Sequence, residues 1–285
     1  MILPNFIICG AAKAGTTALY KFLREHPDVY MPERKEPQFF YNHNSYRRGI
    51  KSFSKSYFDN WNGQKGIGTT CTEYLWRAVV PERIKQHLPN VKLIFLLRNP
   101  IDRIYSHYNF CVRKGYKNPL EEFSCEIRRK GSTFNTEMIY RGMYHVHIKR
   151  YERYFSRDQI KVVLYKNFKK KPKKTIKNIY NFIGVSNKFI PNVSKKYNVS
   201  TYPKNYTLFK FTVGGLFYAR KALRNKFFTK TEGLARKVRE YFYEKGATRT
   251  PPKMDPADRA YLYEIYREPN ARLAEYLGRD LSHWT

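Results

Sequence analysis

The fold of this chain is decided by the stretch ICGAAKAGTT at residues 8–17. An apolar run that begins at Phe6 leads into it, and a helix-like pattern through Leu19 and Leu23 follows it. A strand, a glycine turn and a helix N-terminus in this order form a phosphate cradle, because free backbone N–H groups and the helix dipole point at one anion. The stretch therefore predicts an anion-binding loop between a strand and a helix.

The position of the lysine separates this loop from a nucleoside-triphosphate loop, which reads G-x-x-x-x-G-K-[ST]. Gly10, Gly15 and Thr17 fit that frame. Thr16 stands where the lysine belongs, and Lys13 comes three residues earlier. The loop keeps its backbone donors and lacks the lysine that reaches the β- and γ-phosphates. We therefore expect it to hold one 5′-phosphate rather than a magnesium triphosphate.

A second anion site is predicted after the apolar run at residues 91–97, which is typical of a buried parallel strand. The run ends at Arg98, and Asn99 with Pro100 fits the start of a helix. Ser106 follows two turns into that helix. Because arginine offers a fork of N–H donors and serine a hydroxyl, we expect Arg98 and Ser106 to converge on one anion.

Strand-like and helix-like segments alternate along most of the chain. The strand-like segments are residues 5–10, 66–72, 91–97 and 160–165; the helix-like ones are 16–26, 81–87, 100–114, 146–155 and 173–182, with an extended piece at 29–31. Such alternation predicts an α/β protein with a P-loop-like, three-layer fold, in which helices flank a central, mostly parallel sheet. Ligands bind such sheets at the carboxyl ends of the strands, where both anion loops fall.

The length of 285 residues suits one α/β domain with a substantial core. We expect a single domain over 1–285, with a basic, aromatic helical insertion at about 203–244. Two interpretations of this insertion stay open. It is either an amphipathic stretch that lies on a membrane surface, or a helical hairpin that packs its aromatic side chains on the core.

The charge limits the class of partner. The chain carries 55 Lys and Arg residues against 23 Asp and Glu, a formal net charge of +32. Solubility alone needs a net charge of roughly 2–8 in magnitude. We therefore expect a polyanionic partner, which can be nucleic acid, an anionic membrane surface or an acidic glycan.

Cysteine usage and hydropathy indicate the compartment. The four cysteines show no C-x-x-C pair and no metal-ligand spacing, and Cys9 and Cys71 lie in segments typical of buried thiols. No run approaches the ~18 apolar residues that span a bilayer, and no secretory signal precedes the first motif. We expect a cytoplasmic protein, either free or in peripheral contact with the inner face of the membrane. A Golgi lumenal protein is the alternative if an N-terminal anchor has been trimmed.

The two anion loops together resemble the two cofactor signatures of sulfotransferases that use 3′-phosphoadenosine 5′-phosphosulfate (PAPS). Further stretches resemble the heparan-sulfate-type and bacterial carbohydrate branch of that family. They are HPDV at 26–29, KEPQFF at 35–40, YRGMYHVH at 140–147, and EPN at 268–270 followed by LGRDLSHW at 277–284. The resemblance covers most of the chain and is weakest between about 186 and 240.

The resemblance implies a donor, a product and a set of residues. PAPS is the expected donor and 3′-phosphoadenosine 5′-phosphate (PAP) the product, with no metal. The expected ligands of the 5′-phosphosulfate are Lys13, Ala14, Gly15, Thr16 and Thr17. Lys13 would stabilise the charge that grows on the bridging oxygen. Glu36 matches the family's catalytic base, its pKa raised by burial near Phe39 and Phe40. His43 is the alternative base.

The same resemblance assigns Arg98 and Ser106 to the 3′-phosphate. A late loop closes over the cofactor in this family, and its expected members here are Lys245, Gly246 and Arg249. Which of Lys245 and Arg249 contacts phosphate stays open. The chain also departs from the animal heparan-sulfate enzymes, because Thr70 stands where they carry an active-site lysine. The expected acceptor is therefore not heparan sulfate itself.

The leading hypothesis is a metal-independent, in-line sulfuryl transfer from PAPS to a hydroxyl or amine of a carbohydrate, which can be a glycan, a capsular polysaccharide or a glycolipid. A P-loop kinase or NTPase is an alternative, which the position of Lys13 and a strand ending in Arg98 disfavour. A non-enzymatic polyanion binder is another, suggested by the charge. No helix-turn-helix, zinc or RNA-binding signature supports it, so we expect no specific nucleic-acid partner.

Overall fold

The computed structural model describes residues 1–195, 197, 201–222, 228–244, 247–248, 250 and 252–284. The chain divides into two compact units. The sheet unit, as we call the first, comprises Met1–Arg103, Tyr140–Asn198 and Ile265–Trp284. The helical unit comprises Ile104–Ile139 and Val199–Glu264. The prediction of one domain with an insertion at 203–244 stays a prediction.

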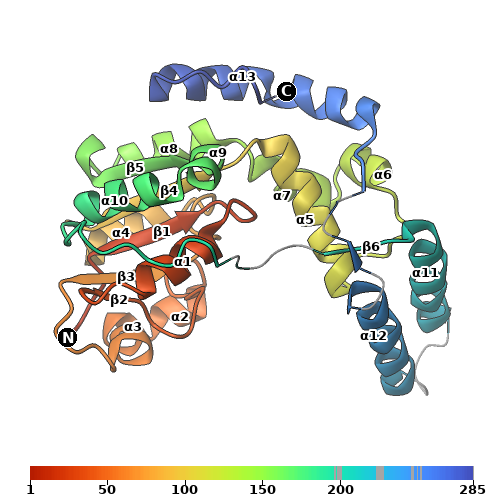
Figure 1. Ribbon diagram of the computed structural model, residues 1–285, viewed down its shortest axis with the longest axis horizontal. Helices are drawn as coiled ribbons and strands as arrows, with labels where there is room; N and C mark the ends of the chain where they lie inside the picture. The colour runs from red at the N-terminus through yellow and green to blue at the C-terminus, as the bar shows by residue number, and fades with distance from the viewer. Residues whose placement is uncertain are drawn as a thin grey trace. The chain divides into compact units, whose positions relative to one another are not determined.

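A five-stranded parallel sheet forms the centre of the sheet unit, in the order β2-β3-β1-β4-β5 (Figure 1). Its strands are β1 (Phe6–Gly10), β2 (Val29–Tyr30), β3 (Gly66–Thr70), β4 (Lys92–Leu97) and β5 (Ile160–Leu164). All four pairings are parallel. The predicted α/β fold with a parallel central sheet is confirmed.

The register brings the carboxyl ends of the three central strands to one edge. Ile8 of β1 pairs with Thr70 of β3 on one side and with Ile94 of β4 on the other. Every residue of β1 is buried, which explains its continuous apolar sequence. The loops that follow β1, β3 and β4 therefore start from neighbouring points on the sheet.

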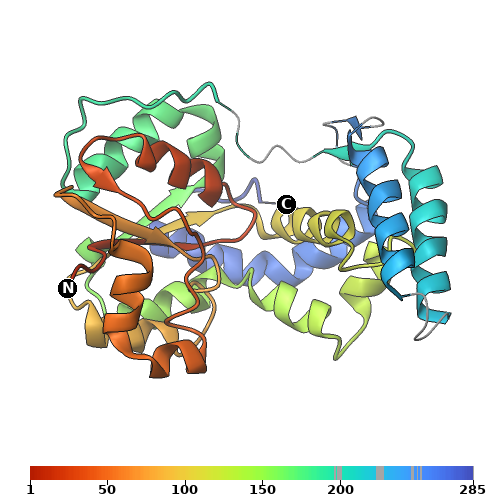
Figure 2. The ribbon, with the colours of Figure 1, turned by 90° about the horizontal axis from the view of Figure 1, so that it is seen from below.

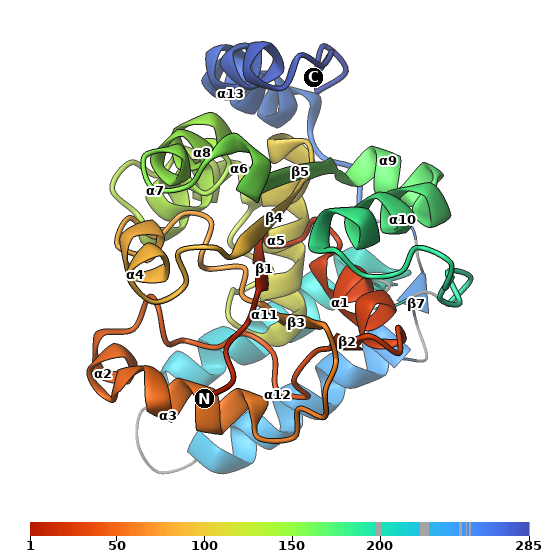
Figure 3. The same cartoon turned by 90° about the vertical axis from the view of Figure 1, so that its left-hand side faces the viewer.

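Helices cover both faces of this sheet. They are α1 (Thr16–Arg24), α2 (His43–Arg47), α3 (Gly49–Phe58), α4 (Val80–His87), α8 (Tyr144–Glu152), the 3-10 turn η1 (Arg157–Gln159), α9 (Tyr165–Lys170) and α10 (Pro172–Ile183). Figure 3 shows α1 and α10 on one face and α4 and α8 on the other. The apolar face of α1, with Leu19 and Leu23, is fully buried, as its periodicity predicts.

The helical unit is built around α11 and α12, which lie side by side (Figure 2). Its other elements are α6 (Phe123–Arg128), α7 (Thr133–Tyr140), β6 (Tyr202–Pro203) and β7 (Ala247–Thr248), with α11 at Tyr206–Ala222 and α12 at Phe228–Glu244. Phe209 of α11 is buried, with its ring edge-on to Phe242 and Tyr243 of α12. Helices α5 (Pro100–Lys114) and α13 (Pro256–Leu277) contribute residues to both units.

One boundary differs from the prediction in a way that matters for the site. The strand expected over residues 66–72 ends at Thr70. The chain then turns, with the backbone N–H of Cys71 donating to the carbonyl of Ile8 at 3.0 Å. The N–H of Thr72 donates to a side chain, the carboxylate of Glu36, at 2.7 Å. The Thr72 N–H is thus bonded to a side chain rather than to a neighbouring strand.

Candidate active site

The loop between β1 and α1 presents the start of α1 to a ligand. Gly15 is the N-cap of the helix, with φ of 92°, and no side chain caps it. The first N–H groups of a helix have no partner within the helix, so they are available to an anion. Lys13 has φ of 68°, a left-handed conformation that L-residues adopt rarely and mostly at functional sites.

Gly15 also sits under the ring of Tyr165. A Cβ at this position would lie 3.0 Å from Cε2 of Tyr165, and its φ already favours glycine. The guanidinium of Arg98 lies 5.3 Å from the centre of the same ring. Tyr165 therefore holds the loop after β1 and the arginine after β4 against one surface.

Arg98 reaches the loop directly. Its Nη1 donates to the carbonyl oxygen of Lys13 at 3.2 Å. Its own carbonyl accepts from the hydroxyl of the buried Tyr144 at 2.9 Å. The two anion motifs, 85 positions apart in sequence, are thus brought together. The role of Arg98 as a 3′-phosphate ligand stays a prediction.

Glu36 is held beside the same strand ends. Its backbone N–H donates to the carbonyl of Thr70 at 2.9 Å, and its φ is 57°. Its Oε2 accepts from the N–H of Thr72 at 2.7 Å and from the Thr72 hydroxyl at 3.2 Å. Burial raises the pKa of the Glu36 carboxyl above its ordinary value, and the hydrogen bonds from Thr72 oppose that rise. The predicted direction of the shift is confirmed.

Lys35, the neighbour of Glu36, turns toward the anion loop. Its Nζ donates to the hydroxyl of Thr17 at 2.8 Å and lies over the ring of Tyr20. Burial lowers the pKa of the Lys35 amine, while the charge of Glu36 raises it. The segment after β2 therefore contributes both a carboxylate and a cation to this edge of the sheet.

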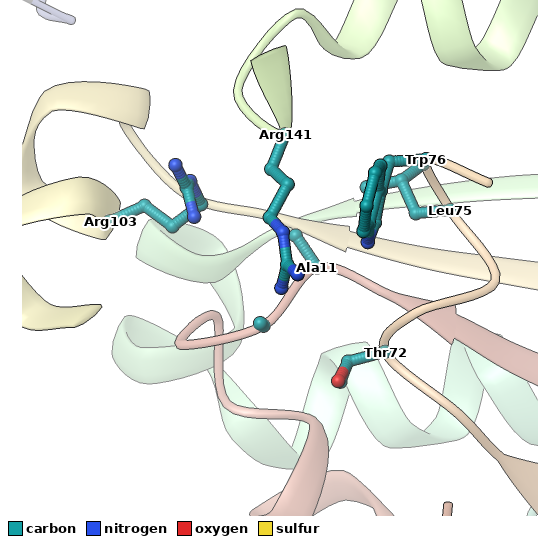
Figure 4. Close-up of a pocket in the computed structure, with 7 residues that line it drawn as sticks. Ala11, Thr72, Leu75, Trp76, Arg103 and Arg141 are labelled. Atoms are coloured by element: carbon teal, nitrogen blue, oxygen red, sulfur yellow. The ribbon is translucent and has the colours of Figure 1, made fainter. Parts of the chain in front are cut away.

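A recess opens between the loop after β1 and the loop after β3. We call it the arginine recess; it is lined by Ala11, Ala12, Thr72, Leu75, Trp76, Arg103 and Arg141. Figure 4 shows the guanidinium of Arg141 reaching toward Ala11, with Trp76 on one side and Arg103 on the other. Arg103 is fully buried. The recess therefore combines loop backbone, two guanidinium groups and the threonine that holds Glu36.

The Arg141 guanidinium is fixed in place. It donates to both carboxylate oxygens of Glu73, at 2.8 and 3.3 Å. It also lies 4.4 Å from the centre of the Trp76 ring. A forked pair of hydrogen bonds and an aromatic face together restrict an arginine to one orientation.

Comparison with known proteins identifies the family of this chain. Residues 3–249 match the sulfotransferase domain. The chain belongs to the sulfotransferase family.

Three relatives illustrate the match. A bifunctional heparan sulfate N-deacetylase/N-sulfotransferase 4 of Mus musculus is 26% identical over 303 residues, covering 99% of this chain and 31% of that protein. A membrane-associated sulfotransferase of Dictyostelium discoideum is 35% identical over 130 residues, 44% of this chain and 27% of that protein. The chain thus spans less than a third of the length of these curated relatives. A solved sulfotransferase from Alicyclobacillus acidocaldarius has a TM-score of 0.70 at 25% identity, covering 100% of this chain and 99% of that one.

The structure does not test the remaining predicted site residues of this sulfotransferase. Ser106 is on α5, partly exposed, and belongs to the helical unit. His43 begins α2 with an exposed side chain, and no hydrogen bond among the described residues joins it to Glu36. Lys245, Gly246 and Arg249 lie outside the described residues. Their roles stay predictions.

No sequence pattern indicated a role for Lys35, Thr72, Arg103 or Arg141. Arg141 stands inside the YRGMYHVH stretch, so its motif was visible. Its partner Glu73 is 68 positions away, and no local pattern links the two. Among the described residues, no helix has the length and hydropathy needed to cross a bilayer.

Proposed function

We propose that this chain transfers a sulfuryl group from PAPS to a hydroxyl or amine of a carbohydrate acceptor. One observation carries the proposal. The Glu36 carboxylate, with its raised pKa, is held by Thr72 at the strand edge from which the anion loop starts. A carboxylate in this state is a better base than one in water, which suits the removal of an acceptor proton.

On the donor side, the free N–H groups at the start of α1 suit a 5′-phosphate, and Lys13 stands in the same loop. The expected contacts are those of Lys13, Ala14, Gly15, Thr16 and Thr17. When the S–O bond breaks, negative charge grows on the bridging oxygen and the 5′-phosphate, and Lys13 would stabilise it. Arg98 and Ser106 would hold the 3′-phosphate, which distinguishes PAPS from ATP. The late loop with Lys245, Gly246 and Arg249 would close over the bound donor.

On the acceptor side, Glu36 would take the proton as the acceptor oxygen or nitrogen bonds to sulfur, and PAP would leave from the opposite side. Little covalent chemistry is required of the protein, so positioning and charge supply most of the rate enhancement. A relative named for heparan sulfate and the net charge of +32 both support an anionic glycan as acceptor.

A peripheral membrane contact of residues 203–244 is part of the proposal, with a glycolipid as the matching acceptor. Leu208, Phe211 and Tyr218 are exposed on α11, on a chain that is strongly basic. A relative is named as membrane-associated. A cytoplasmic location with contact at the inner membrane face fits, since Cys9 and Cys71 are buried free thiols.

Calorimetric titration with PAP, beside Mg·ATP, tests the donor. We expect micromolar binding of PAP and weak or no binding of ATP. Arg98→Ala should weaken PAP binding at least tenfold, because a charge-assisted pair is lost. Arg47→Ala, which removes an exposed arginine from α2, is the matched control and should bind PAP like the wild type. Preference for ATP, or binding of neither nucleotide, would overturn the proposal.

A further inference from the structure

A second concave surface of the sheet unit is lined by close sequence neighbours of Glu36. We call it the cationic groove; its polar lining consists of Arg34, Gln38, Ser45, Arg48, Ser52 and Ser56. One wall comes from the segment after β2 and the other from α2 and α3.

The helical wall is a row of polar groups at helical spacing. Ser45, Arg48, Ser52 and Ser56 follow one another at intervals of three or four residues. Ser52 and Ser56, four residues apart, lie on one face of α3, while Ser45 belongs to α2 and Arg48 joins the two helices. Three hydroxyl groups and a guanidinium therefore line this wall of the groove. Hydroxyl groups that donate and accept hydrogen bonds, beside a cation, suit a polyhydroxylated anion.

The two guanidinium groups of the groove are available to form ion pairs with a ligand. Arg34 and Arg48 are both exposed, and neither forms an ion pair with a described residue. The carboxylate closest in sequence, Glu33, is engaged by Arg24 at 2.8 Å. This contrasts with Arg141, whose charge is already matched by Glu73.

An aromatic side chain, held by buried rings, also lines the groove. The Arg34 guanidinium lies over the ring of Tyr57, 5.7 Å from its centre. Tyr57 is partly exposed and packs against Phe53, which is stacked on Phe39 with ring centres 4.8 Å apart. Because Phe53 and Phe39 are buried, the exposed ring is fixed from below. An aromatic face next to a cation suits the apolar face of a sugar that carries a carboxylate or sulfate.

The groove is linked to the proposed base by the chain itself. Arg34 and Gln38 stand two residues before and after Glu36. Two residues of chain span at most about 7 Å, so the Cα atoms of this wall lie close to that of Glu36. Thr72, which holds Glu36, lines the arginine recess. An acceptor whose reacting group meets Glu36 would therefore place a neighbouring sugar at the groove.

We propose that the cationic groove binds an anionic sugar residue of the acceptor, next to the one that is sulfated. This inference rests on the proposed sulfuryl transfer and narrows its substrate to a glycan chain with carboxylate or sulfate groups. Arg34 and Arg48 grip the anionic group, and the serine row with Gln38 contacts the hydroxyls. These residues act on acceptor binding and take no part in the bond changes at sulfur.

The test compares two double variants that remove the same charge. Arg34→Ala with Arg48→Ala removes the groove cations; Arg47→Ala with Lys51→Ala removes two exposed cations from α2 and α3 outside the groove. The probe is a heparosan octasaccharide, in which glucuronic acid alternates with N-acetylglucosamine, titrated into the PAP-saturated chain. The groove variant should bind it at least tenfold more weakly than the wild type, and the control variant less than threefold. The carboxyl-reduced octasaccharide should bind both variants equally.

Equal losses in the two variants, or no binding of heparosan by the wild type, would overturn the inference. Arg34→Gln with Arg48→Gln removes the charge but keeps part of the side-chain stem and a polar end, and it repeats the test if the alanine variant does not fold. PAP titration of the same samples separates the two proposals. A chain that binds heparosan through the groove but does not bind PAP would refute the sulfuryl transfer alone.

Discussion

The arginine recess contains Thr72, which holds Glu36, and the cationic groove contains Arg34 and Gln38, two residues from Glu36 in sequence. The two regions present their arginines in opposite ways. In the recess, Arg141 is held by two hydrogen bonds to Glu73 and by the Trp76 ring. In the groove, Arg34 and Arg48 are exposed and have no ion-pair partner among the described residues. The arginine of the recess is fixed before any ligand binds, while the arginines of the groove can pair with a ligand.

This difference predicts which kinetic parameter each region affects. A fixed cation stabilises developing charge without reorganising, so changes in the recess should appear mainly in kcat. Exposed cations pair with whatever anion arrives and contribute to binding, so changes in the groove should appear mainly in KM for the acceptor. The changes that follow test that division, from the largest effect to the smallest.

Glu36→Gln should have the largest effect. The amide cannot accept the acceptor proton, so kcat should fall by about 10²–10⁴, the usual contribution of a general base. In the wild type, kcat/KM should fall on acidification as Glu36 is protonated, with a midpoint above the ordinary glutamate pKa because burial raises it. Glu33→Gln, at an exposed carboxylate, should leave rate and profile unchanged. A variant with wild-type turnover would remove Glu36 from the chemistry.

Glu36→Gln, which should lower activity, should raise the stability of the folded chain at neutral pH. Below the ordinary glutamate pKa, Glu36 is protonated in both the folded and the unfolded chain. As pH rises, the unfolded chain ionises first, because burial raises the pKa of the folded carboxyl, so the folded state loses stability up to its own pKa. Glu36→Gln should therefore raise Tm at pH 7.5 and leave it unchanged near pH 4. A lower Tm at pH 7.5, measured by circular dichroism, would contradict this.

Lys13→Ala is expected to come next. Removing one group that stabilises the leaving oxygen should lower kcat by about 10²–10³, while PAP binding changes only a few-fold. Lys21→Ala removes the same charge from the last turn of α1, beyond the anion loop, and should retain wild-type kcat. Rapid-quench turnover beside PAP titration separates the two parameters. A loss confined to PAP binding would make Lys13 a binding residue only.

Much of this site follows from local sequence pattern. The anion loop, its strand and its helix come from glycine spacing and apolar runs, and the meeting of Lys13 with Arg98 follows from strand ends that share an edge. Glu36 came from family resemblance. The contacts that hold its carboxylate could not be predicted, because Thr72 is 36 positions away and turns toward it only where β3 ends. Side-chain pairs between distant loops depend on tertiary packing, which no local pattern encodes.

Arg141→Lys should have a moderate effect. Lysine keeps the charge but loses the forked contact with Glu73 and the stacking on Trp76, so kcat should fall about tenfold. Arg77→Lys is the matched control, because Arg77 also contacts Glu73 and Trp76 but does not line the recess. Equal losses in the two variants would mean that the Glu73 and Trp76 cluster acts through its packing rather than through the recess.

Thr72→Val should have the smallest effect and the most specific one. The backbone N–H of Thr72 still donates to Glu36, but the hydroxyl hydrogen bond is lost. That bond favours the ionised carboxylate, so the pKa of Glu36 should rise further, and the acidic limb of kcat/KM should move to higher pH. One such bond contributes about 0.5–1.5 kcal/mol, so the limb should move by less than about one pH unit. Thr69→Val is the control, since the Thr69 hydroxyl on β3 is buried and has no hydrogen-bond partner among the described residues. If both variants moved the limb equally, or neither did, the acidic limb would not report the Glu36 carboxylate.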